Sequence, residues 1–220
     1  MRGKKLSVRA SKGISTASSV IKKKNLLPTI YGAKYCLDHF GETMPVHHDI
    51  EQLRLVLGGA NSGKSLFAEN LVRQSGRPRR YIATAQAWDD EMRAKISAHK
   101  AQRGTNWITL EAPLDLVGAL ALAKTNEIVL LDCVTLWLTN MMMAEQDITQ
   151  ATKSLCTALS EASCPVVVVS NEVGQGIVPN NAMARAFINY QGNLNQALAN
   201  VAQEVFFVIA GLPQQLKGHP

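Results

Sequence analysis

The most constraining feature of this chain is a glycine-rich loop at residues 58–65, which reads Gly-Gly-Ala-Asn-Ser-Gly-Lys-Ser. A short apolar run at 53–57 precedes the loop, and residues 66–73 continue with helical periodicity. Strand, loop and helix in this order surround a phosphate-binding loop, whose backbone N–H groups hold a polyphosphate. The alternative is a glycine-rich turn that matches by chance, and the flanking segments argue against it. The loop therefore predicts binding of a nucleoside triphosphate.

Two side chains of this loop and one distant carboxylate are candidates for phosphate and metal binding. Lys64 is expected to reach the β- and γ-phosphates, and the hydroxyl of Ser65 to ligate Mg²⁺. The apolar run 128–131 ends in Asp132, which we expect to lie across from the loop and complete the metal site. The alternative is that Asp132 only caps the next helix, with Thr135 sharing that role.

Strand-like and helix-like segments alternate from residue 51 to the end of the chain. Continuous apolar runs are typical of parallel strands that are buried on both faces. The order predicts an α/β fold, a three-layer P-loop NTPase-like domain with a mostly parallel sheet and right-handed crossovers. Strands are expected near 53–57, 80–84, 107–110, 127–131, 165–169 and 205–209, and helices near 64–75, 88–103, 114–124, 147–161 and 182–203.

Charge divides the chain near residue 50. Residues 1–50 hold nine Lys and Arg against three Asp and Glu, whereas residues 51–220 hold fourteen of each. The net charge of +6 thus belongs to the first segment, and the neutral remainder argues against a nucleic-acid partner. We expect 1–50 to be a basic, Ser-rich, disordered tail, or sequence upstream of a start at Met44, with an organelle transit peptide as the alternative. Residues 51–220 are expected to form the catalytic domain.

Cysteine usage and hydropathy bear on the compartment. The four cysteines lack Cys-x-x-Cys spacing and form no metal-binding pattern with the five histidines. No run of 18 or more apolar residues occurs in the sequence, so no membrane span is predicted. We therefore expect reduced thiols in a cytoplasmic protein.

The expected helix at 88–103 carries a histidine of interest. Met92 and Ile96 share one helical face with His99 and Arg103, and these apolar residues indicate that the face is buried. His99 is thus expected to point inward, where a lone histidine is more often a hydrogen-bonded core residue than a catalyst. A neutral imidazole is nevertheless a good nucleophile toward phosphorus, and Arg103 and Lys100 could stabilise phosphate charge. Both interpretations stay open.

Glu111 and the loop at residues 171–179 lie at the carboxyl ends of expected strands. Ligands bind at these strand ends in open α/β sheets. Glu111 is a candidate hydrogen-bond acceptor for a base or ribose, the alternative being a solvated side chain. Residues 171–179 form a polar, glycine-bearing loop after the strand at 165–169, which could equally be an ordinary connection.

Taken together, these residues resemble the bifunctional adenosylcobinamide kinase / adenosylcobinamide-phosphate guanylyltransferase family of cobalamin biosynthesis. The resemblance runs from about residue 53 to the C-terminus, and the basic tail lies outside it. In family order, the matching segments are the loop 58–65, Tyr81-Ile82-Ala83-Thr84-Ala85, Asp90-Glu91-Met92, Ile96-x-x-His99-x-x-x-Arg103, Trp107-x-Thr109-x-Glu111-x-Pro113, Asp132-Cys133-x-Thr135-Leu136-Trp137-Leu138-Thr139-Asn140, Asn171 to Pro179, and Gly192-x-x-Asn195-Gln196.

The resemblance implies two reactions. ATP or GTP phosphorylates a hydroxyl of adenosylcobinamide, and GMP from GTP then joins that phosphate, releasing pyrophosphate and giving adenosylcobinamide-GDP. It implies that His99 becomes guanylylated, that His99 and Lys64 are catalytic, that Mg²⁺ binds at Ser65 and Asp132, and that the protein is a homotrimer with sites near subunit boundaries. The residues implied to bind nucleotide are Gly58, Gly59, Ala60, Asn61, Ser62, Gly63, Lys64, Ser65, Ala83, Thr84, Ala85, Lys100, Ala101, Gln102, Arg103, Glu111 and Asp132.

The chain departs from the family pattern at three places. Asn61 stands where the loop commonly has Arg, and Lys95 replaces the Arg that usually precedes Ile96. Ile188-Asn189 replaces an Arg-Asp pair, which puts corrinoid recognition and the retention of both activities in question. The alternatives are another small-molecule P-loop kinase without a covalent intermediate, or a non-catalytic GTP-binding relative.

Overall fold

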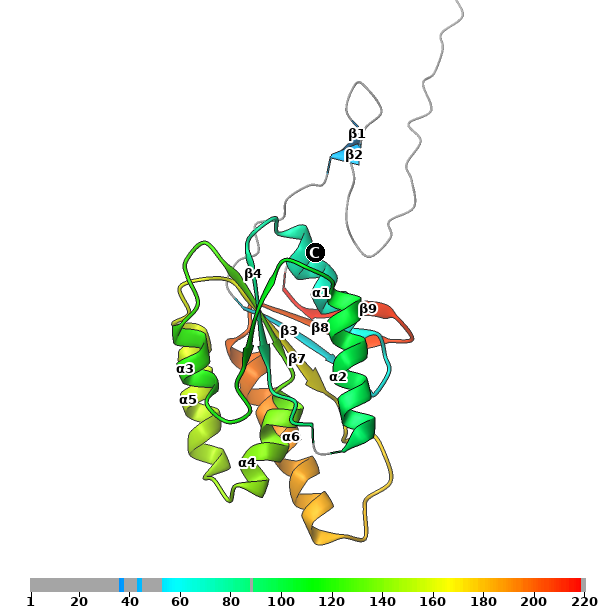
Figure 1. Ribbon diagram of the computed structural model, residues 1–220. Coiled ribbons are helices and arrows are strands. Elements are labelled where there is room, and N and C mark those ends of the chain that lie inside the picture. Colours follow the sequence, from blue (N-terminus) through cyan, green and yellow to red (C-terminus); the bar gives the residue numbers. More distant parts are fainter. Residues whose placement is uncertain (1–35, 38–42, 45–52, 88, 219–220) are drawn as a thin grey trace, which may run out of the picture.

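The computed structural model describes residues 36–37, 43–44, 53–87 and 89–218 (Figure 1). Seven strands form one sheet in the order β5-β4-β6-β7-β3-β8-β9. Neighbouring strands are parallel throughout, except for the antiparallel pair of β8 and β9. Their bounds are β3 Leu53–Gly58, β4 Arg79–Ala83, β5 Trp107–Glu111, β6 Ile128–Asp132, β7 Val166–Asn171, β8 Glu204–Ile209 and β9 Leu212–Lys217.

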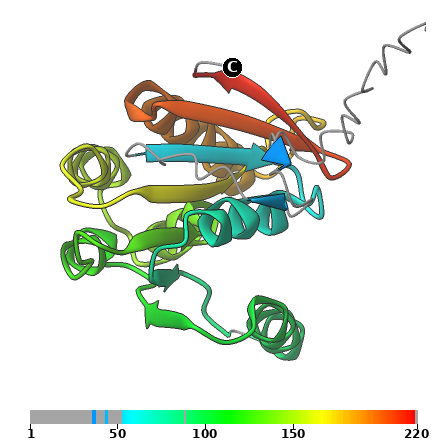
Figure 2. The same cartoon turned by 90° about the horizontal axis from the view of Figure 1, so that it is seen from above.

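Five of the six helices in the described ranges cover the two faces of this sheet, and the view from above shows α2 standing apart from it (Figure 2). α1 packs into the core on one face, and α3, α4, α5 and α6 pack into the core on the other. The predicted three-layer α/β fold with a mostly parallel sheet is therefore confirmed. The helices are α1 Lys64–Gln74, α2 Asp90–Arg103, α3 Leu116–Ala121, α4 Val134–Met143, α5 Ile148–Ser160 and α6 Ala182–Val201.

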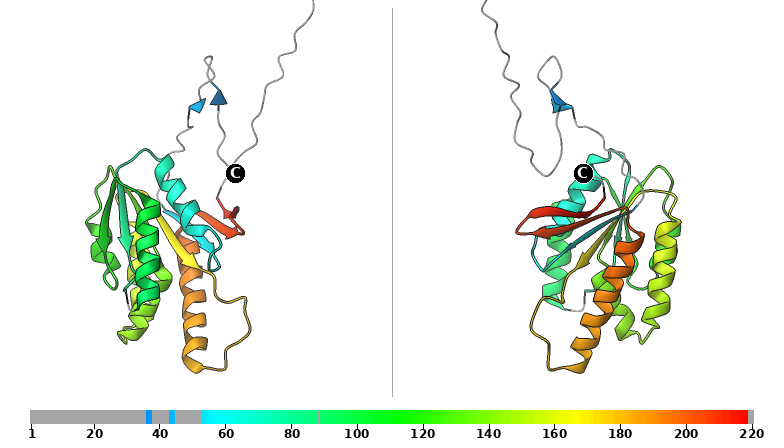
Figure 3. Two further views of the ribbon diagram at one scale, coloured as in Figure 1. Left: turned by 45° about the vertical axis from the view of Figure 1, so that its right-hand side comes forward. Right: turned by 180° about the vertical axis from the view of Figure 1, so that it is seen from behind.

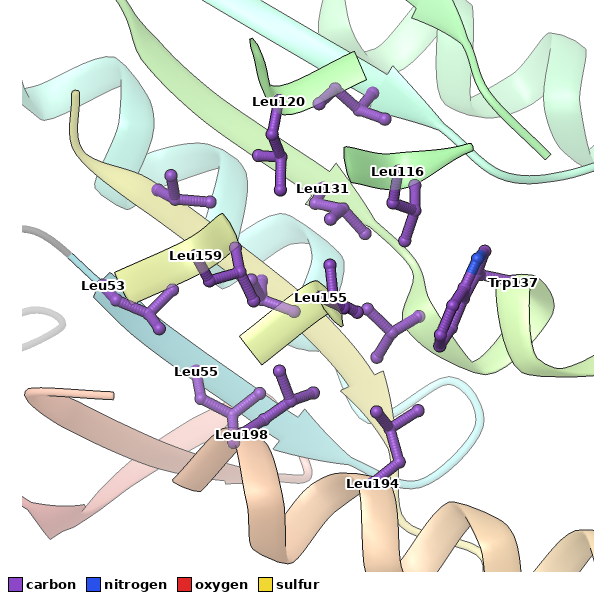
Figure 4. Packing of buried hydrophobic residues seen from close by; sticks show 14 of the residues in the cluster. Leu53, Leu55, Leu116, Leu120, Leu131, Trp137, Leu155, Leu159, Leu194 and Leu198 are labelled. Carbon is purple, nitrogen blue, oxygen red and sulfur yellow. The ribbon is translucent and has the colours of Figure 1, made fainter. Parts of the chain in front are cut away.

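The central strands β3, β6 and β7 are mostly apolar because both faces are covered. The larger of the two cores lies between the sheet and the helices α3, α4, α5 and α6. In β3, Leu53, Leu55 and Leu57 point into this larger core, whereas Val56 points toward α1. This is the two-residue alternation of a strand, with an apolar layer on each side. Figure 4 shows Leu55 beside Leu198 of α6 and Leu53 beside Leu159 of α5 in the larger core.

Within residues 51–220, two elements were absent from the predicted set, and the short strands β1 (Cys36–Leu37) and β2 (Thr43–Met44) in the N-terminal segment were not predicted either. α4 follows Asp132 directly, and its apolar sequence has a weak helical pattern because both of its sides contact protein, with Trp137 and Leu138 in the larger core. β9 is a polar edge strand, which Figure 3 shows beside β8 at the margin of the sheet. An edge strand exposed to solvent lacks the apolar run that identifies the central strands.

The N-terminal segment is described only in part. β1 (Cys36–Leu37) and β2 (Thr43–Met44) form a short antiparallel pair. The rest of the predicted tail at 1–50 lies outside the described residues, so its expected disorder stays a prediction. Among the helices within the described ranges, none has both the length and the hydrophobicity needed to cross a membrane.

Candidate nucleotide site

The loop between β3 and α1 has the backbone geometry of a phosphate cradle. Gly63 adopts a φ of +91° at the N-cap of α1, and a Cβ there would lie 3.1 Å from the Cα of Gly211. A Cβ on Gly58 would lie 2.7 Å from the carbonyl oxygen of Val208. A Cβ on Gly59, by contrast, would meet nothing within 4 Å, so no packing within the described chain requires that glycine.

The N-terminus of α1 is prepared for an anion. No side chain caps it, and its first turn contains no acidic residue. Its first N–H groups and the positive end of the helix dipole therefore face the loop, and no carboxylate of the helix's own first turn opposes them. A phosphate group placed there would accept hydrogen bonds from these N–H groups and would be stabilised by the helix dipole.

Lys64 lies inside this cradle. Its side chain is buried, with its residue 9% exposed, and its Nζ donates a hydrogen bond to the carbonyl oxygen of Gly59 at 3.0 Å. Burial lowers the pKa of Lys64, and the negative charge of nearby Asp132 opposes that shift. Anionic phosphates would hold the ammonium in its charged form in the same way.

Asp132 ends β6 opposite the loop, as predicted. The hydroxyls of Ser65 and Tyr81 both hydrogen-bond to its carboxylate, and Tyr81 Oη lies 3.3 Å from Oδ2. Burial raises the pKa of Asp132, whereas the positive charge of His99, the hydrogen bond from Ser65 and the charge of Lys64 lower it. The carboxyl group thus lies among the other candidate residues.

The oxygen ligands here fit Mg²⁺ bound together with a nucleotide. Ser65 and Asp132 supply a hydroxyl and a carboxylate that already contact each other. In the part of the chain that the structure describes, no group of three or more His, Cys, Asp or Glu side chains could hold a metal unaided. Mg²⁺ keeps few protein ligands and completes its shell with phosphates and water.

These residues line a pocket of about 640 Å³ at the carboxyl edge of the sheet. A smaller cavity of about 270 Å³ shares four of its walls and places His99 beside the loop residues 61–66. Such volumes suit a nucleotide-sized ligand. The larger pocket is lined by Ala60, Asn61, Lys64, Ser65, Tyr81, Ala83, Ala85, Gln86, Ala87, Ile96, His99, Lys100, Arg103, Glu111, Pro113, Asp132, Cys133, Leu136 and Asn171.

The prediction that His99 points into a buried face is wrong. His99 is exposed, and Ile96 on the same face is only half-buried. The reason is that α2 stands apart from the sheet (Figure 2), so its inner face borders the pocket instead of the core. The side chain of Met92 lies outside the described residues. His99 makes no hydrogen bond to any described residue, so it is not a core histidine with satisfied partners.

The C-terminal end of α2 contacts the rest of the domain, whereas the middle of the helix borders the pocket. Arg103 is only 7% exposed, and its guanidinium lies 3.5 Å from the ring centroid of Tyr81. Arg73 of α1 donates a hydrogen bond to the carbonyl oxygen of Arg103 at 3.3 Å and pairs with buried Glu69 at 3.0 Å. The helix that carries His99 is therefore tied to the helix that follows the phosphate loop.

The structure brings most of the predicted catalytic and nucleotide-binding residues together. Those that line one of the two cavities are Ala60, Asn61, Ser62, Gly63, Lys64, Ser65, Ala83, Ala85, His99, Lys100, Arg103, Glu111 and Asp132. Among these, Lys100 and Glu111 pair across the pocket mouth at 3.7 Å.

The remaining predicted ligands do not line either cavity. Thr84 is fully buried, and its hydroxyl donates to the carbonyl oxygen of Cys133 and accepts from the N–H of the same residue. Gly58, Gly59 and Ala101 are also outside the lining, and the side chain of Gln102 is not among the described ones. A contact of these residues with nucleotide stays a prediction.

Tyr81 and Asn171 are two of the lining residues that were not predicted as ligands. Tyr81 was part of a matching segment without an assigned role, and Asn171 was only the start of a loop. Tyr81 lies with Leu130 on the side of the sheet that α1 covers. The two-residue period of a strand is the sequence signal that could have placed it on that side.

Replacing Tyr81 with phenylalanine is expected to weaken Mg²⁺ use about tenfold, because the lost hydroxyl orients the Asp132 carboxylate. The ring remains beneath Arg103, so the KM for GTP at saturating Mg²⁺ should stay within about twofold of the wild-type value, well under the 1.4 kcal/mol that a tenfold change represents. Steady-state rates at varied GTP and Mg²⁺ concentrations measure both. Tyr81→Leu is the matched variant, which should also raise the KM for GTP because it removes the ring. An unchanged Mg²⁺ requirement in Tyr81→Phe would contradict the role given to the hydroxyl.

Comparison with known proteins agrees with this site. Residues 54–216 match the family described as cobinamide kinase / cobinamide phosphate guanyltransferase. The bifunctional adenosylcobalamin biosynthesis protein CobP of Pseudomonas aeruginosa is 44% identical over 169 residues, covering 76% of this chain and 98% of that protein. The proteins named CobU of Escherichia coli and Salmonella typhimurium are 40% and 39% identical, each covering 74% of this chain and 98% of its relative. A phosphate loop, a carboxylate and a histidine around one pocket, within a sequence that matches over most of its length, place this chain in the cobinamide kinase / cobinamide phosphate guanyltransferase family.

Proposed function

We propose that this protein phosphorylates adenosylcobinamide with ATP or GTP and then transfers GMP from GTP to adenosylcobinamide phosphate, giving adenosylcobinamide-GDP and pyrophosphate. The observation that carries the proposal is that His99 lines the same cavity as Lys64 and Ser65. A triphosphate held by the loop would then have an imidazole in the same open cavity. Membership in the family supports the identity of the acceptor.

In the first reaction, the loop positions the nucleotide and the substrate hydroxyl attacks the γ-phosphorus. Lys64 and the N–H groups at the start of α1 stabilise charge on the phosphate oxygens. Mg²⁺, when held by Ser65, Asp132 and the phosphates, would neutralise further negative charge. The protein's contribution is therefore mainly position and electrostatics.

In the second reaction, His99 acts as a nucleophile. A ring nitrogen forms a bond to the α-phosphorus of GTP while the bond to the α–β bridging oxygen breaks, and pyrophosphate leaves with that electron pair. The ring then loses its other N–H proton to water, which gives a phosphoramidate whose ring is uncharged. A phosphate oxygen of adenosylcobinamide phosphate next attacks the same phosphorus, the P–N electron pair returns to the ring, and the other ring nitrogen takes a proton back from water, which restores the neutral imidazole.

Arg103 and Lys100 are proposed to stabilise the phosphate charge during this transfer. Both line the pocket on the helix that carries His99. Arg103 is held against the Tyr81 ring, whereas Lys100 pairs with exposed Glu111 among the described residues. Arg103 is thus the preorganised cation, and Lys100 is free to turn toward a ligand.

A kinase without a covalent intermediate is the second candidate. In that case His99 would be structural, yet it is exposed and makes no hydrogen bond to another described residue. The family resemblance further suggests a homotrimer in the cytoplasm, and both remain parts of this proposal.

Product analysis tests the proposal. Adenosylcobinamide, GTP and Mg²⁺ are incubated with the protein, and the corrinoid products are separated. Formation of adenosylcobinamide-GDP and pyrophosphate is expected. Accumulation of adenosylcobinamide phosphate alone would support the simple kinase, and unchanged adenosylcobinamide would overturn both.

A further inference from the structure

Asn171 is a pocket residue whose carboxamide has no partner. It ends β7, and it lines the larger pocket. Its Oδ1 is shielded from solvent without a hydrogen bond, and no bond from its side chain to another described residue exists. Leaving a buried acceptor unpaired costs about 1–3 kcal/mol, so such an atom calls for an explanation.

The strand order places Asn171 between the two halves of the catalytic machinery. β7 lies between β6, which ends at Asp132, and β3, which leads into the phosphate loop. In the parallel register Asn171 is opposite Gly58, the first residue of that loop. The N–H of Glu172 also donates to the carbonyl oxygen of Gly58 at 3.1 Å, which joins the end of β7 to the loop.

The backbone of Asn171 is held on both sides by buried side chains. Its N–H donates to Thr135 Oγ1 at 2.7 Å, and its carbonyl oxygen accepts from Asn195 Nδ2 at 3.0 Å. Asn195 is in turn fixed by Ser170, which donates to Asn195 Oδ1 at 2.6 Å, and by Gln191 Nε2 at 2.9 Å.

These four holding residues, Thr135, Ser170, Gln191 and Asn195, are at most 6% exposed, and none lines either cavity. A buried polar network of this kind rigidifies what it surrounds. Here it fixes the one residue at the end of β7 that reaches the pocket.

The chemistry of the unpaired atom selects its partner. A carboxamide oxygen only accepts hydrogen bonds, and phosphate oxygens of a nucleotide also accept. Lys64 uses one of its three N–H donors on Gly59, and the hydroxyl of the phosphoryl acceptor is a further donor that must approach the γ-phosphate beside the loop. The carboxamide is too weak a base to remove the proton, so its role is to orient the hydroxyl.

Resting on the proposed function, we infer that Asn171 is a catalytic residue of the phosphorylation step only, and that its Oδ1 accepts a hydrogen bond from the attacking hydroxyl of the corrinoid substrate. The hydroxyl oxygen forms a bond to the γ-phosphorus while the bond to the β–γ bridging oxygen breaks. The nucleoside diphosphate leaves with that electron pair, and the hydroxyl proton passes through a phosphoryl oxygen to water. Guanylylation of His99 involves no alcohol and does not use Asn171.

Asn171→Leu is the decisive variant, because leucine has a similar size and removes the unpaired oxygen. The rate of phosphorylation of adenosylcobinamide should fall at least about tenfold, the loss of one orienting hydrogen bond. The rate at which GTP alone labels the protein should change less than about threefold. The melting temperature without ligand should stay the same or rise, since a buried unpaired acceptor disappears.

Asn180→Leu serves as the matched control, since Asn180 is exposed on the loop that follows β7 and should leave both rates unchanged. Asn171→Ala provides a second variant with the same expected split between the two rates. Equal loss of both rates, or an unaffected phosphorylation rate, would overturn the inference. If wild-type protein itself forms neither product nor label, the proposed function fails instead.

Discussion

Replacing His99 with alanine is expected to lower guanylyl transfer by at least about a thousandfold, because the covalent route loses its nucleophile. Phosphorylation of adenosylcobinamide should stay within about threefold, since the phosphate loop, Lys64 and Asp132 are untouched. His99 is exposed and makes no hydrogen bond to another described residue, so its removal leaves no buried group unpaired. The variant should therefore accumulate adenosylcobinamide phosphate, measured by separating the corrinoid products over time.

Ser97→Ala is the control for this experiment, because Ser97 is exposed on the same helix and does not line the pocket. It should behave as the wild-type protein in both reactions. Full guanylyl transfer by His99→Ala would rule out the covalent mechanism. Loss of both activities would mean that His99 supports the nucleotide site as a whole.

Asp132→Asn is expected to stabilise the ligand-free protein while it lowers Mg²⁺-dependent phosphorylation by about a hundredfold or more. Burial raises the pKa of Asp132, so the folded state holds the charged carboxylate at a cost that asparagine avoids. We expect a gain of about 1 kcal/mol, which corresponds to a melting temperature about 2–4 °C higher for a domain of this size.

The pH dependence of this effect has a defined sign. Between the ordinary pKa of an aspartate, about 3.9, and the raised pKa in the fold, the native protein binds more protons at Asp132 than the unfolded chain does. The wild-type protein therefore loses stability relative to Asp132→Asn as the pH rises through this window, and the difference is constant above it. Thermal unfolding of both proteins across that range measures the difference. If Asp132→Asn is less stable than the wild-type protein at neutral pH, burial does not disfavour the charged carboxylate of Asp132 as we infer.

The sequence predicted the parts of the fold that depend on local pattern. Continuous apolar runs at β3, β6 and β7 indicated a parallel sheet buried on both faces, and the loop at 58–65 located the phosphate cradle. β9 was not predicted because it is an edge strand without an apolar run. Its polar residues include Gln214 and Gln215. α4 was not predicted because it contacts protein on both sides, so its sequence does not show one apolar and one polar face.

The site was only partly predictable for a related reason. Helical periodicity tells which residues share a face with His99, but it does not tell whether that face meets a core or a cavity. Asn171 illustrates a second limit. An unpaired carboxamide oxygen arises from the arrangement of α4, α6 and β7 around one residue, and no spacing in the sequence encodes it.

The central claim is that His99 takes up the guanylyl group, and the most direct test is to identify the modified residue. The protein is incubated with GTP and Mg²⁺ without a corrinoid, quenched in base to preserve a phosphoramidate, and analysed by mass spectrometry of the intact chain and its peptides. The account predicts one added guanylyl group per chain, located on His99 and removed by acid. A guanylyl group on another residue, or an unmodified chain in a preparation that still produces adenosylcobinamide-GDP, would contradict it.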